Sequence, residues 1–167
     1  GTPNAAERAE ADDAGVPTVT TPPTTFPTPT TTGQTITGDS SNNTLSGTSG
    51  NDVINGNGGK DTLWGGSGND MFLFDTASEA NGDTVRDFVH GADKINLAGI
   101  DANTRAYGDQ AFTFIGTQGF HKVAGELKAY QLSGNTYLAG DVNGDGYADF
   151  TIKALGAHTF ANADFVL

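Results

Sequence analysis

Acidic side chains recur at an interval of nine residues between Gly38 and Phe74. Four consecutive nonapeptides align there without a gap, and their sixth positions are Asn43, Asp52, Asp61 and Asp70. Glycine, asparagine and serine fill most neighbouring positions, so backbone carbonyl groups lie beside each acid. A loose cage of carboxylate and carbonyl oxygens suits Ca²⁺, whereas Mg²⁺ demands a stricter octahedral geometry. The pattern therefore predicts calcium binding, with roughly two to four ions per chain.

An apolar residue follows each of these positions two residues later. The four apolar residues are Leu45, Ile54, Leu63 and Phe72. The first six residues of a repeat favour a tight turn, and the last three favour a short strand in which only the middle side chain faces inward. Two repeats then form one right-handed coil with a rise of about 4.8 Å, and successive coils pair as parallel sheets. The pattern GGxGxDxUx is typical of calcium-binding parallel β-helices. It places Leu45 and Leu63 in one sheet and Ile54 and Phe72 in the other.

Stacking of alternate repeats brings the sixth-position residues together in pairs. Asn43 should lie over Asp61 on one side of the roll, and Asp52 over Asp70 on the other. Two carboxylates at this spacing repel each other, and one apolar side chain per repeat is too thin a core to offset the repulsion without a cation. We therefore predict that this region is largely disordered without calcium. A flexible linker is the alternative, but a linker has no reason to keep acidic and apolar positions in phase.

The composition narrows the class of protein. Lysine and arginine number 8 against 20 aspartate and glutamate residues, which gives a formal charge of −12 over 167 residues, and cysteine is absent. This charge argues against nucleic acid or an anionic membrane as a partner. A secreted protein without disulfides needs other stabilising cross-links, and bound metal ions can provide them. No apolar run approaches the ~20 residues of a membrane span. We expect a secreted, extracellular and monomeric protein.

The chain divides into three parts by composition. Residues 1–32 are predicted to be a disordered tail followed by a linker, because Val16–Thr32 consists largely of threonine and proline. Proline favours extended polyproline II, which makes a semi-rigid spacer. Such spacers resemble the linkers that join the catalytic domain of an extracellular enzyme to an accessory module. Residues 33–75 form the predicted roll, with a lead-in strand at Gln34–Thr37, and residues 76–167 form a C-terminal β domain.

From Asp75 onward the nine-residue period is lost. Short β-favouring runs alternate with Gly/Asn/Asp turns, which predicts an all-β domain. The expected strands are 84–89, 94–97, 111–115, 126–132, 136–139, 149–155 and 164–167. Met71, Leu73 and Phe74 are apolar where earlier repeats are polar or small, and the last coil would expose an unpaired sheet edge. We therefore predict that an antiparallel sheet or sandwich caps the roll. Trp64 either packs under this cap or offers a platform for stacking a sugar.

Four segments carry a resemblance to a known family. They are Gly82–Asp101, Gly108–Gly116, Ala124–Leu127 and Gly140–Phe150. Together with the repeats they resemble the C-terminal domain of serralysin-type metalloproteases, which also occurs on other proteins exported by type I secretion, including polysaccharide-modifying enzymes. The resemblance implies a calcium-loaded β-roll with a β-sandwich that is itself non-catalytic. It also implies the type I secretion machinery as a partner, because Ala163–Leu167 is similar to the uncleaved secretion signal of such proteins.

The resemblance further implies which oxygens surround each ion. Carbonyls of positions one and three join the acid of one coil, and carbonyls of positions two and four join the acid of the coil below. One site then takes Gly47, Ser49 and Asp52 with Gly66, Gly68 and Asp70. A second site, weaker because it lacks one charge, takes Gly38, Ser40 and Asn43 with Asn57, Gly59 and Asp61. A third would use Gly65, Ser67 and Asp70 closed by Asp83, and a fourth would use Gly56, Gly58 and Asp61 closed by Asp75 and Glu79.

Other motifs speak against catalysis. Asp141–Asp149 imitates the start of an EF-hand loop, but Ile152 stands where the loop needs glutamate, so we interpret it as a hairpin turn and leave calcium binding open. His90, His121 and His158 lack the His-Glu-x-x-His spacing of zinc proteases, and no GxSxG elbow, P-loop or cysteine nucleophile occurs. We expect an accessory module whose parent protein is an extracellular hydrolase, lyase, epimerase or protease.

Two functions fit these features. The first is a secretion and folding module, kept unfolded by its carboxylates where calcium is scarce and folded outside the cell by calcium at about 10⁻⁴–10⁻³ M. The second is an accessory module, tethered to a carbohydrate-active enzyme, that binds an acidic or neutral polysaccharide with Trp64 and the tyrosines as stacking residues. The net charge of the chain counts against an acidic glycan unless calcium bridges the two. Glycan titration of the calcium-loaded protein separates the two. An adhesin segment is a third interpretation.

Overall fold

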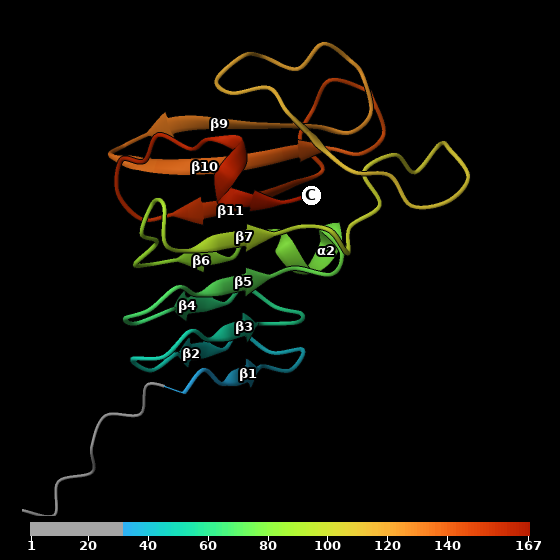
Figure 1. Cartoon of the computed structure of the whole chain (residues 1–167). Coiled ribbons are helices and arrows are strands. Elements are labelled where there is room, and N and C mark those ends of the chain that lie inside the picture. The colour runs from blue at the N-terminus through green and yellow to red at the C-terminus, as the bar shows by residue number, and fades with distance from the viewer. Residues whose placement is uncertain (1–31) are drawn as a thin grey trace, which may run out of the picture.

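The computed structural model describes residues 32–167, which form a stack of short strands from β1 at one end to β9 at the other (Figure 1). The tail and linker predicted for residues 1–32 lie, except for Thr32, outside the described residues. Within the described part of the chain, no helix is long and apolar enough to cross a bilayer.

Five three-residue strands form the first part of the stack. They are β1 (Thr35–Thr37), β2 (Thr44–Ser46), β3 (Val53–Asn55), β4 (Thr62–Trp64) and β5 (Met71–Leu73). Strands β1, β3 and β5 pair in parallel in one sheet, and β2 pairs in parallel with β4 in the other. Leu45 lies beside Leu63, and Ile54 lies beside Phe72. The prediction that two nonapeptides make one coil is therefore confirmed.

The middle residue of each strand fills the space between the two sheets. Ile54, Leu63 and Phe72 are fully buried. Ile36 and Leu45 belong to the first coil and are only partly buried, because no described coil covers them from the other side. The core therefore thickens from the first coil toward the C-terminal half of the molecule.

The coils continue past the last full repeat. Strand β6 (Thr84–Val85) pairs in parallel with β4, and β7 (Lys94–Asn96) pairs in parallel with β5. The loops before these strands are longer than those of the repeats, since the equivalent residues Asp61 and Asp83 are 22 positions apart. The first of these loops contains helix α2 (Ala77–Ala80). The sequence pattern does not predict α2, because one helical turn is too short to leave a period in the sequence.

The C-terminal strands extend both sheets of the roll. They are β8 (Thr113–Phe114), β9 (Glu126–Leu132), β10 (Asn135–Asp141), β11 (Phe150–Ala154) and β12 (Phe165–Val166). One sheet has the order β1-β3-β5-β7-β12 and the other has the order β2-β4-β6-β11-β10-β9-β8. Strands β9, β10 and β11 are antiparallel, and β11 joins the parallel part through β6. The fold is thus the predicted all-β roll with an antiparallel cap, although neither sheet breaks at residues 75–76, where the domain boundary was placed.

The predicted cover of the last coil is only partly present. Phe74 is buried in the core, as expected. Met71 and Leu73 instead remain half-buried on the outward face of β5, beside β7. Trp64 does not lie under the cap: it faces outward, and the guanidinium carbon of Arg86 lies 4.8 Å from its ring centroid.

Candidate metal sites

Two columns of stacked side chains run along the two sides of the roll. One column contains Asn43, Asp61 and Asp83, and the other contains Asp52, Asp70 and Asp93. Within each column, the backbone N–H of one member donates to the Oδ1 atom of the next. The N···O distances are 2.7 Å for Asn43 to Asp61, 2.8 Å for Asp61 to Asp83, 2.8 Å for Asp52 to Asp70 and 2.9 Å for Asp70 to Asp93. The turns thus position each carboxylate over the turn of the preceding coil.

The second oxygen of several carboxylates has no partner. Among residues 32–167, the Oδ2 atoms of Asp61, Asp70 and Asp83 and the Oε2 atom of Glu79 are buried without a hydrogen bond. The three aspartates are at most 1% exposed. A buried acceptor left unsatisfied costs about 1–3 kcal/mol, and more when it is charged. Such oxygens are the donor set that a hard cation requires, so the residues present fit Ca²⁺.

Burial makes these carboxylates poor anions in the absence of a cation. Desolvation raises the pKa of Asp83 to about 7, and the negative charges of Asp61 and Glu79 add to the shift. Desolvation likewise raises the pKa of Asp61, Asp70 and Asp93. Hydrogen bonds from the stacked backbone N–H groups oppose these shifts without cancelling them. A bound cation would reverse the balance by stabilising the ionised form.

Backbone carbonyls must complete any cation site. Within the described residues, no group of three or more His, Cys, Asp and Glu side chains is arranged to hold a metal. The loops stack closely enough for carbonyls to contribute, because a Cβ atom at Gly66 would lie 2.1 Å from the carbonyl oxygen of Thr48, and one at Gly68 would lie 2.3 Å from that of Gly50. Both glycines also have positive φ angles, of 95° and 123°. Glycine is therefore required at these positions on two counts.

The loop pairs of the first two predicted sites are brought together. Asp52 stacks with Asp70, and Asn43 stacks with Asp61. In the second pair, the side-chain amide of Asn57 donates to the carbonyl oxygen of Gly38 at 2.8 Å. That carbonyl is one of the predicted ligands, so calcium would share it with the amide. The individual ligands of both sites remain predictions.

The third predicted site is wrong in its closing residue. Asp83 does not lie over Asp70: it accepts the N–H of Asp61, on the opposite side of the roll. The residue that stacks with Asp70 is Asp93. Counting eighteen residues from Gly65 failed because the α2 loop lengthens the coil. Asp83 therefore belongs to the column of Asp61, and Asp93 closes the column of Asp70.

The two acids predicted to close the fourth site lie in different surroundings. Glu79 lies close enough to Asp83 for its charge to raise the pKa of that carboxyl, and its own Oε2 is buried without a partner. Asp75 instead accepts a hydrogen bond from the side-chain amide of Asn55 at 2.8 Å and contacts Gly99. Asp83 therefore stacks with Asp61, Glu79 lies near Asp83, and the ligands of this site remain a prediction.

Sequence reasoning missed two acids in the loop between β6 and β7. Besides Asp93, which also accepts the Val89 N–H at 2.8 Å, this loop supplies Asp87. The Asp87 carboxylate accepts the N–H groups of Gly65 and Gly66 at 2.8 and 2.9 Å, and its charge raises the pKa of Asp70 and Asp93. Both acids lie in the segment Gly82–Asp101 that carried the family resemblance, and that segment was the signal that could have revealed them.

In the EF-hand-like loop 141–149, backbone N–H groups of the loop itself donate hydrogen bonds to its carboxylates. The Asp141 carboxylate accepts the N–H groups of Asn143, Gly144 and Gly146 at 3.1, 2.6 and 2.8 Å. The Asp149 carboxylate accepts the N–H of Val142 at 2.7 Å. The loop connects the antiparallel strands β10 and β11. It is thus the predicted connection between two strands, closed by its own hydrogen bonds.

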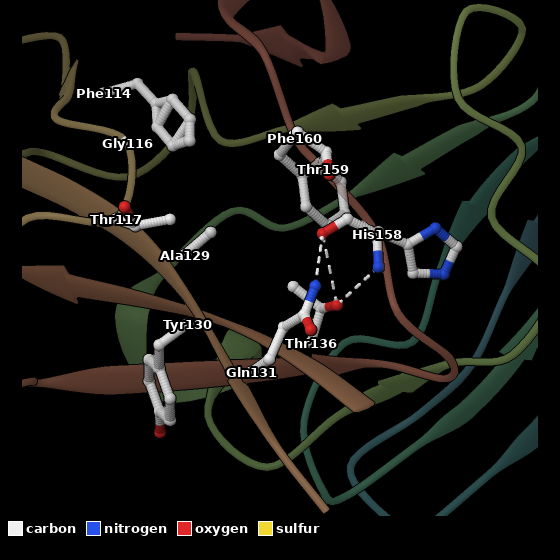
Figure 2. Close-up of a pocket in the computed structure, with 10 residues that line it drawn as sticks. All are labelled: Phe114, Gly116, Thr117, Ala129, Tyr130, Gln131, Thr136, His158, Thr159 and Phe160. Carbon is white, nitrogen blue, oxygen red and sulfur yellow. Dashed lines mark hydrogen bonds between the residues drawn. The ribbon is translucent and has the colours of Figure 1, made fainter. Parts of the chain in front are cut away.

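A cavity of about 350 Å³ opens at the far end of the cap (Figure 2). Its walls include Phe114, Ala129 and Phe160. Its polar side chains hold the chain segment that follows β11, because Thr136 Oγ1 accepts the N–H of His158 at 2.8 Å and Gln131 Nε2 donates to the carbonyl oxygen of His158 at 3.3 Å (Figure 2). Thr136 and Gln131 are therefore engaged with the backbone of the segment that follows β11.

The histidines are engaged separately. Nδ1 of His121 lies 2.6 Å from Oε1 of Glu126, and Nδ1 of His90 lies 2.9 Å from Oδ2 of Asp164. Nε2 of His158 lies 2.8 Å from the carbonyl oxygen of Leu155. Each histidine thus has a local structural partner.

Comparison with known proteins gives a family match over most of the chain. Residues 34–167 match the family described as Peptidase M10 serralysin C terminal. No curated protein sequence matches the chain.

Three solved structures are similar to this chain at low sequence identity. The AlgE6R3 subunit of the Azotobacter vinelandii mannuronan C5-epimerase is 19% identical over 80% of this chain and 77% of that chain, with a TM-score of 0.48. Its AlgE6R2 subunit is 21% identical over 79% of this chain and 91% of that chain, with a TM-score of 0.44. The extracellular lipase LipA from Serratia marcescens is 18% identical over 80% of this chain, with a TM-score of 0.45. The match spans only 20% of the lipase chain.

Proposed function

Because the chain belongs to the family of serralysin C-terminal domains of peptidase family M10, a family of calcium-binding β-roll modules of secreted proteins, we propose that it is a non-catalytic module that folds on Ca²⁺ outside the cell. The observation that carries this proposal is the set of buried, unpartnered carboxylate oxygens on Asp61, Asp70 and Asp83. Where calcium is scarce, these groups oppose folding by repulsion and lost hydration. Where calcium is abundant, the free energy of binding becomes free energy of folding.

In this proposal the ions lie between stacked loops of each column. Asp52 with Asp70, and Asp70 with Asp93, hold ions on one side. Asn43 with Asp61, and Asp61 with Asp83 and Glu79, hold ions on the other. Backbone carbonyls of the glycine turns fill the remaining coordination positions. The chain's own residues thus supply at least two carboxylates at every place except the one that contains Asn43.

Far-ultraviolet circular dichroism of the whole chain tests the proposal. We expect the β signal to be lost on chelation and restored by Ca²⁺, but not by an equal concentration of Mg²⁺, which demands a smaller and more regular site. A chain that keeps its full β signal in calcium-free buffer at neutral pH would contradict coupled folding.

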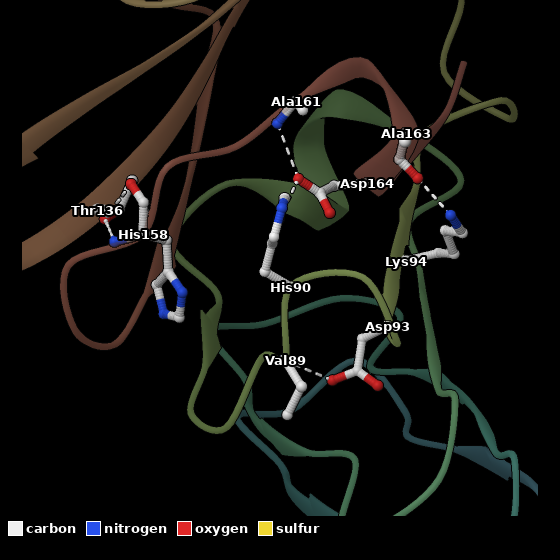
Figure 3. Close-up of polar contacts among 9 residues, drawn as sticks. All are labelled: Val89, His90, Asp93, Lys94, Thr136, His158, Ala161, Ala163 and Asp164. Carbon is white, nitrogen blue, oxygen red and sulfur yellow. Dashed lines mark hydrogen bonds and ion pairs between the residues drawn. The ribbon is translucent and has the colours of Figure 1, made fainter.

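We also propose that the C-terminal residues carry the type I secretion signal and are read before the chain folds. Strand β12 pairs in parallel with β7, and Asp164, which is 1% exposed, accepts the Ala161 N–H at 2.8 Å and contacts His90 (Figure 3). The Lys94 ammonium donates to the Ala163 carbonyl oxygen. Since β7 directly follows Asp93, calcium binding there would order the strand on which β12 docks. Calcium would then conceal a signal that the unfolded chain exposes.

Secretion of a reporter fused to residues 32–167, from a host with a type I exporter, tests this second part. Removal of residues 162–167 should abolish export. Export that is unchanged by the deletion would place the signal elsewhere.

We propose polysaccharide binding as a second function of the folded module. The specific observation is the outward face of the seven-stranded sheet, where aromatic rings lie beside lysine and arginine side chains. Aromatic rings stack on the apolar faces of sugars, and polar groups around them fix the orientation.

A further inference from the structure

One row of outward-facing side chains crosses six strands of the seven-stranded sheet. Register places Tyr130 beside Tyr137, Tyr137 beside Lys153, and Lys153 beside Thr84. The row continues through Thr62 to Thr44 in the roll. The residues that alternate with them, such as Leu138 and Leu63, are buried in the core, so the row lies on the outer surface. Roll and cap therefore share one continuous outer face.

The aromatic rings and cations of this face are held in contact with one another. The rings of Tyr130 and Tyr137 stack with centroids 5.4 Å apart and planes inclined by 14°. The Lys128 ammonium lies 4.4 Å from the ring centroid of Phe120 and 5.7 Å from that of Tyr130. On the roll side, the same kind of contact joins Arg86 to Trp64. These side chains are ordered before any ligand arrives, which lowers the entropic cost of binding.

The face is basic although the chain is acidic. Three cationic side chains, Arg86, Lys128 and Lys153, lie on or beside it. Within residues 32–167, none of the three forms an ion pair, because the ion pairs there are those of His90 and His121. The acids at the ends of β9 and β10, Glu126 and Asp141, are buried and hydrogen-bonded within the chain. The Asp87 carboxylate beside Arg86 is likewise held by the N–H groups of Gly65 and Gly66. The outer face therefore offers cations that form no ion pair within the described residues.

We infer that this face binds a linear acidic polysaccharide, whose chain runs across the strands along the row from Tyr130 to Thr44. The inference rests on the second proposed function and names its ligand class. Adjacent strands are about 4.8 Å apart, a spacing comparable to the length of one sugar ring. Tyr130 and Tyr137 stack on ring faces, Lys128 and Lys153 pair with uronate carboxylates, and the threonine hydroxyls bond to sugar hydroxyls. Each part of the face then has a matching part of the ligand.

The net charge of the chain bears on which kind of polyanion, a nucleic acid or a polyuronate, the face can bind. A nucleic acid carries a phosphate on every nucleotide and depends on many cationic contacts. Three cations on a chain with a formal charge of −12 cannot supply them. A uronate polymer carries one carboxylate per sugar, so it is less densely charged than a duplex nucleic acid, and it also presents apolar ring faces to the tyrosines. The face therefore favours an acidic glycan over a duplex nucleic acid.

Calorimetric titration of the calcium-loaded chain, with folding verified by circular dichroism, tests the inference. The probes are a galacturonate hexamer, a neutral cellulose hexamer and a thymidine hexanucleotide, all at one fixed free-calcium concentration because uronates also bind calcium. We expect the galacturonate hexamer to bind more tightly than the other two. Equal binding of the neutral hexamer would overturn the acidic class while leaving polysaccharide binding in place. No binding of either glycan would overturn both, and equal binding of the oligonucleotide would overturn glycan recognition.

Variants locate the site. Replacing Lys128 and Lys153 together by alanine should weaken galacturonate binding by about tenfold or more, because two charge-assisted contacts are lost. Tyr137→Ala should weaken binding of the galacturonate hexamer with the charges intact. Arg105→Ala removes one charge from an exposed loop away from the sheet and should leave the affinity unchanged. Equal affinities for the double lysine variant and the Arg105→Ala control would place the glycan elsewhere.

Discussion

The backbone N–H of Asp70 donates to Oδ1 of Asp93 at 2.9 Å, across 23 residues of chain. This contact repeats, outside the regular repeats, the relationship that joins Asp52 to Asp70 within them. The acid column thus continues beyond the nonapeptides and into the loop before β7.

Asp93→Asn tests whether this extension binds calcium. Asparagine keeps an Oδ1 acceptor for the Asp70 N–H but removes the charge and the Oδ2 acceptor of the Val89 N–H, so the site between Asp70 and Asp93 should weaken. Calorimetric calcium titration should show about tenfold or greater loss at one site, with the others retained. Asp75→Asn, a matched change outside the columns, is the control. Identical titrations of the two variants would contradict a role for Asp93.

The two columns should differ in strength. Asp52→Ala removes one of two carboxylates from a fully charged pair, whereas Asn43→Ala removes a neutral amide from a pair that has only one. We predict that Asp52→Ala raises the calcium concentration needed for half-folding more than Asn43→Ala does. Calcium titration of both variants by circular dichroism measures this. Equal midpoints would mean that the pairing of turns does not determine affinity.

The pKa of Asp83 predicts a pH dependence for the calcium-free chain. Burial raises this pKa from 3.8 to about 7. Between these values the folded state binds more protons than the unfolded state, so the free energy of unfolding falls as the pH rises. We predict that the calcium-free chain is most structured at the acidic end of this window and loses β signal toward pH 7.

Circular dichroism in calcium-stripped buffers across this range is the measurement. Asp83→Asn should flatten the profile, because the amide does not titrate. The raised pKa of Asp61, Asp70 and Asp93 acts in the same direction and leaves a residual slope. A β signal that increases with pH in the absence of calcium would contradict the sign of the effect.

A fragment that ends at residue 75 tests the need for the cap. Truncation removes Asp83 and Asp93 from the two columns and leaves Phe74, whose N–H donates to the Asn96 carbonyl, uncovered. It also leaves the edge of β5 unpaired. We predict no calcium-dependent β signal from residues 32–75 and recovery when residues 76–167 are supplied. Folding of the fragment at the midpoint of the whole chain would show that the roll is autonomous.

The sequence was informative where its period was strict. Leu45 beside Leu63 and Ile54 beside Phe72 follow from a nine-residue repeat without insertions, because the interval alone determines which strands pair. The long alternating run at Glu126–Leu132 likewise predicted a strand with matching bounds. In both cases the pattern that predicts the structure lies within a short stretch of sequence.

Prediction failed where the period changed. Asp83 was assigned to the wrong column because α2 lengthens its coil, and one helical turn leaves no recognisable pattern. Asp93 was missed for the same reason, as it lies 23 residues from Asp70. The pairing of β12 with β7 joins the last residues to a strand about 70 positions earlier, as in Phe165 beside Ile95. No local pattern specifies such a contact.

Anomalous diffraction from crystals of the chain grown with calcium tests the central claim most directly. We predict anomalous peaks between the stacked loops of both columns, in contact with the Oδ2 atoms of Asp61, Asp70 and Asp83. Crystals of Asp70→Ala should lose the peaks beside residue 70 and keep those of the other column. A folded chain whose columns show no anomalous peak in abundant calcium would contradict the account.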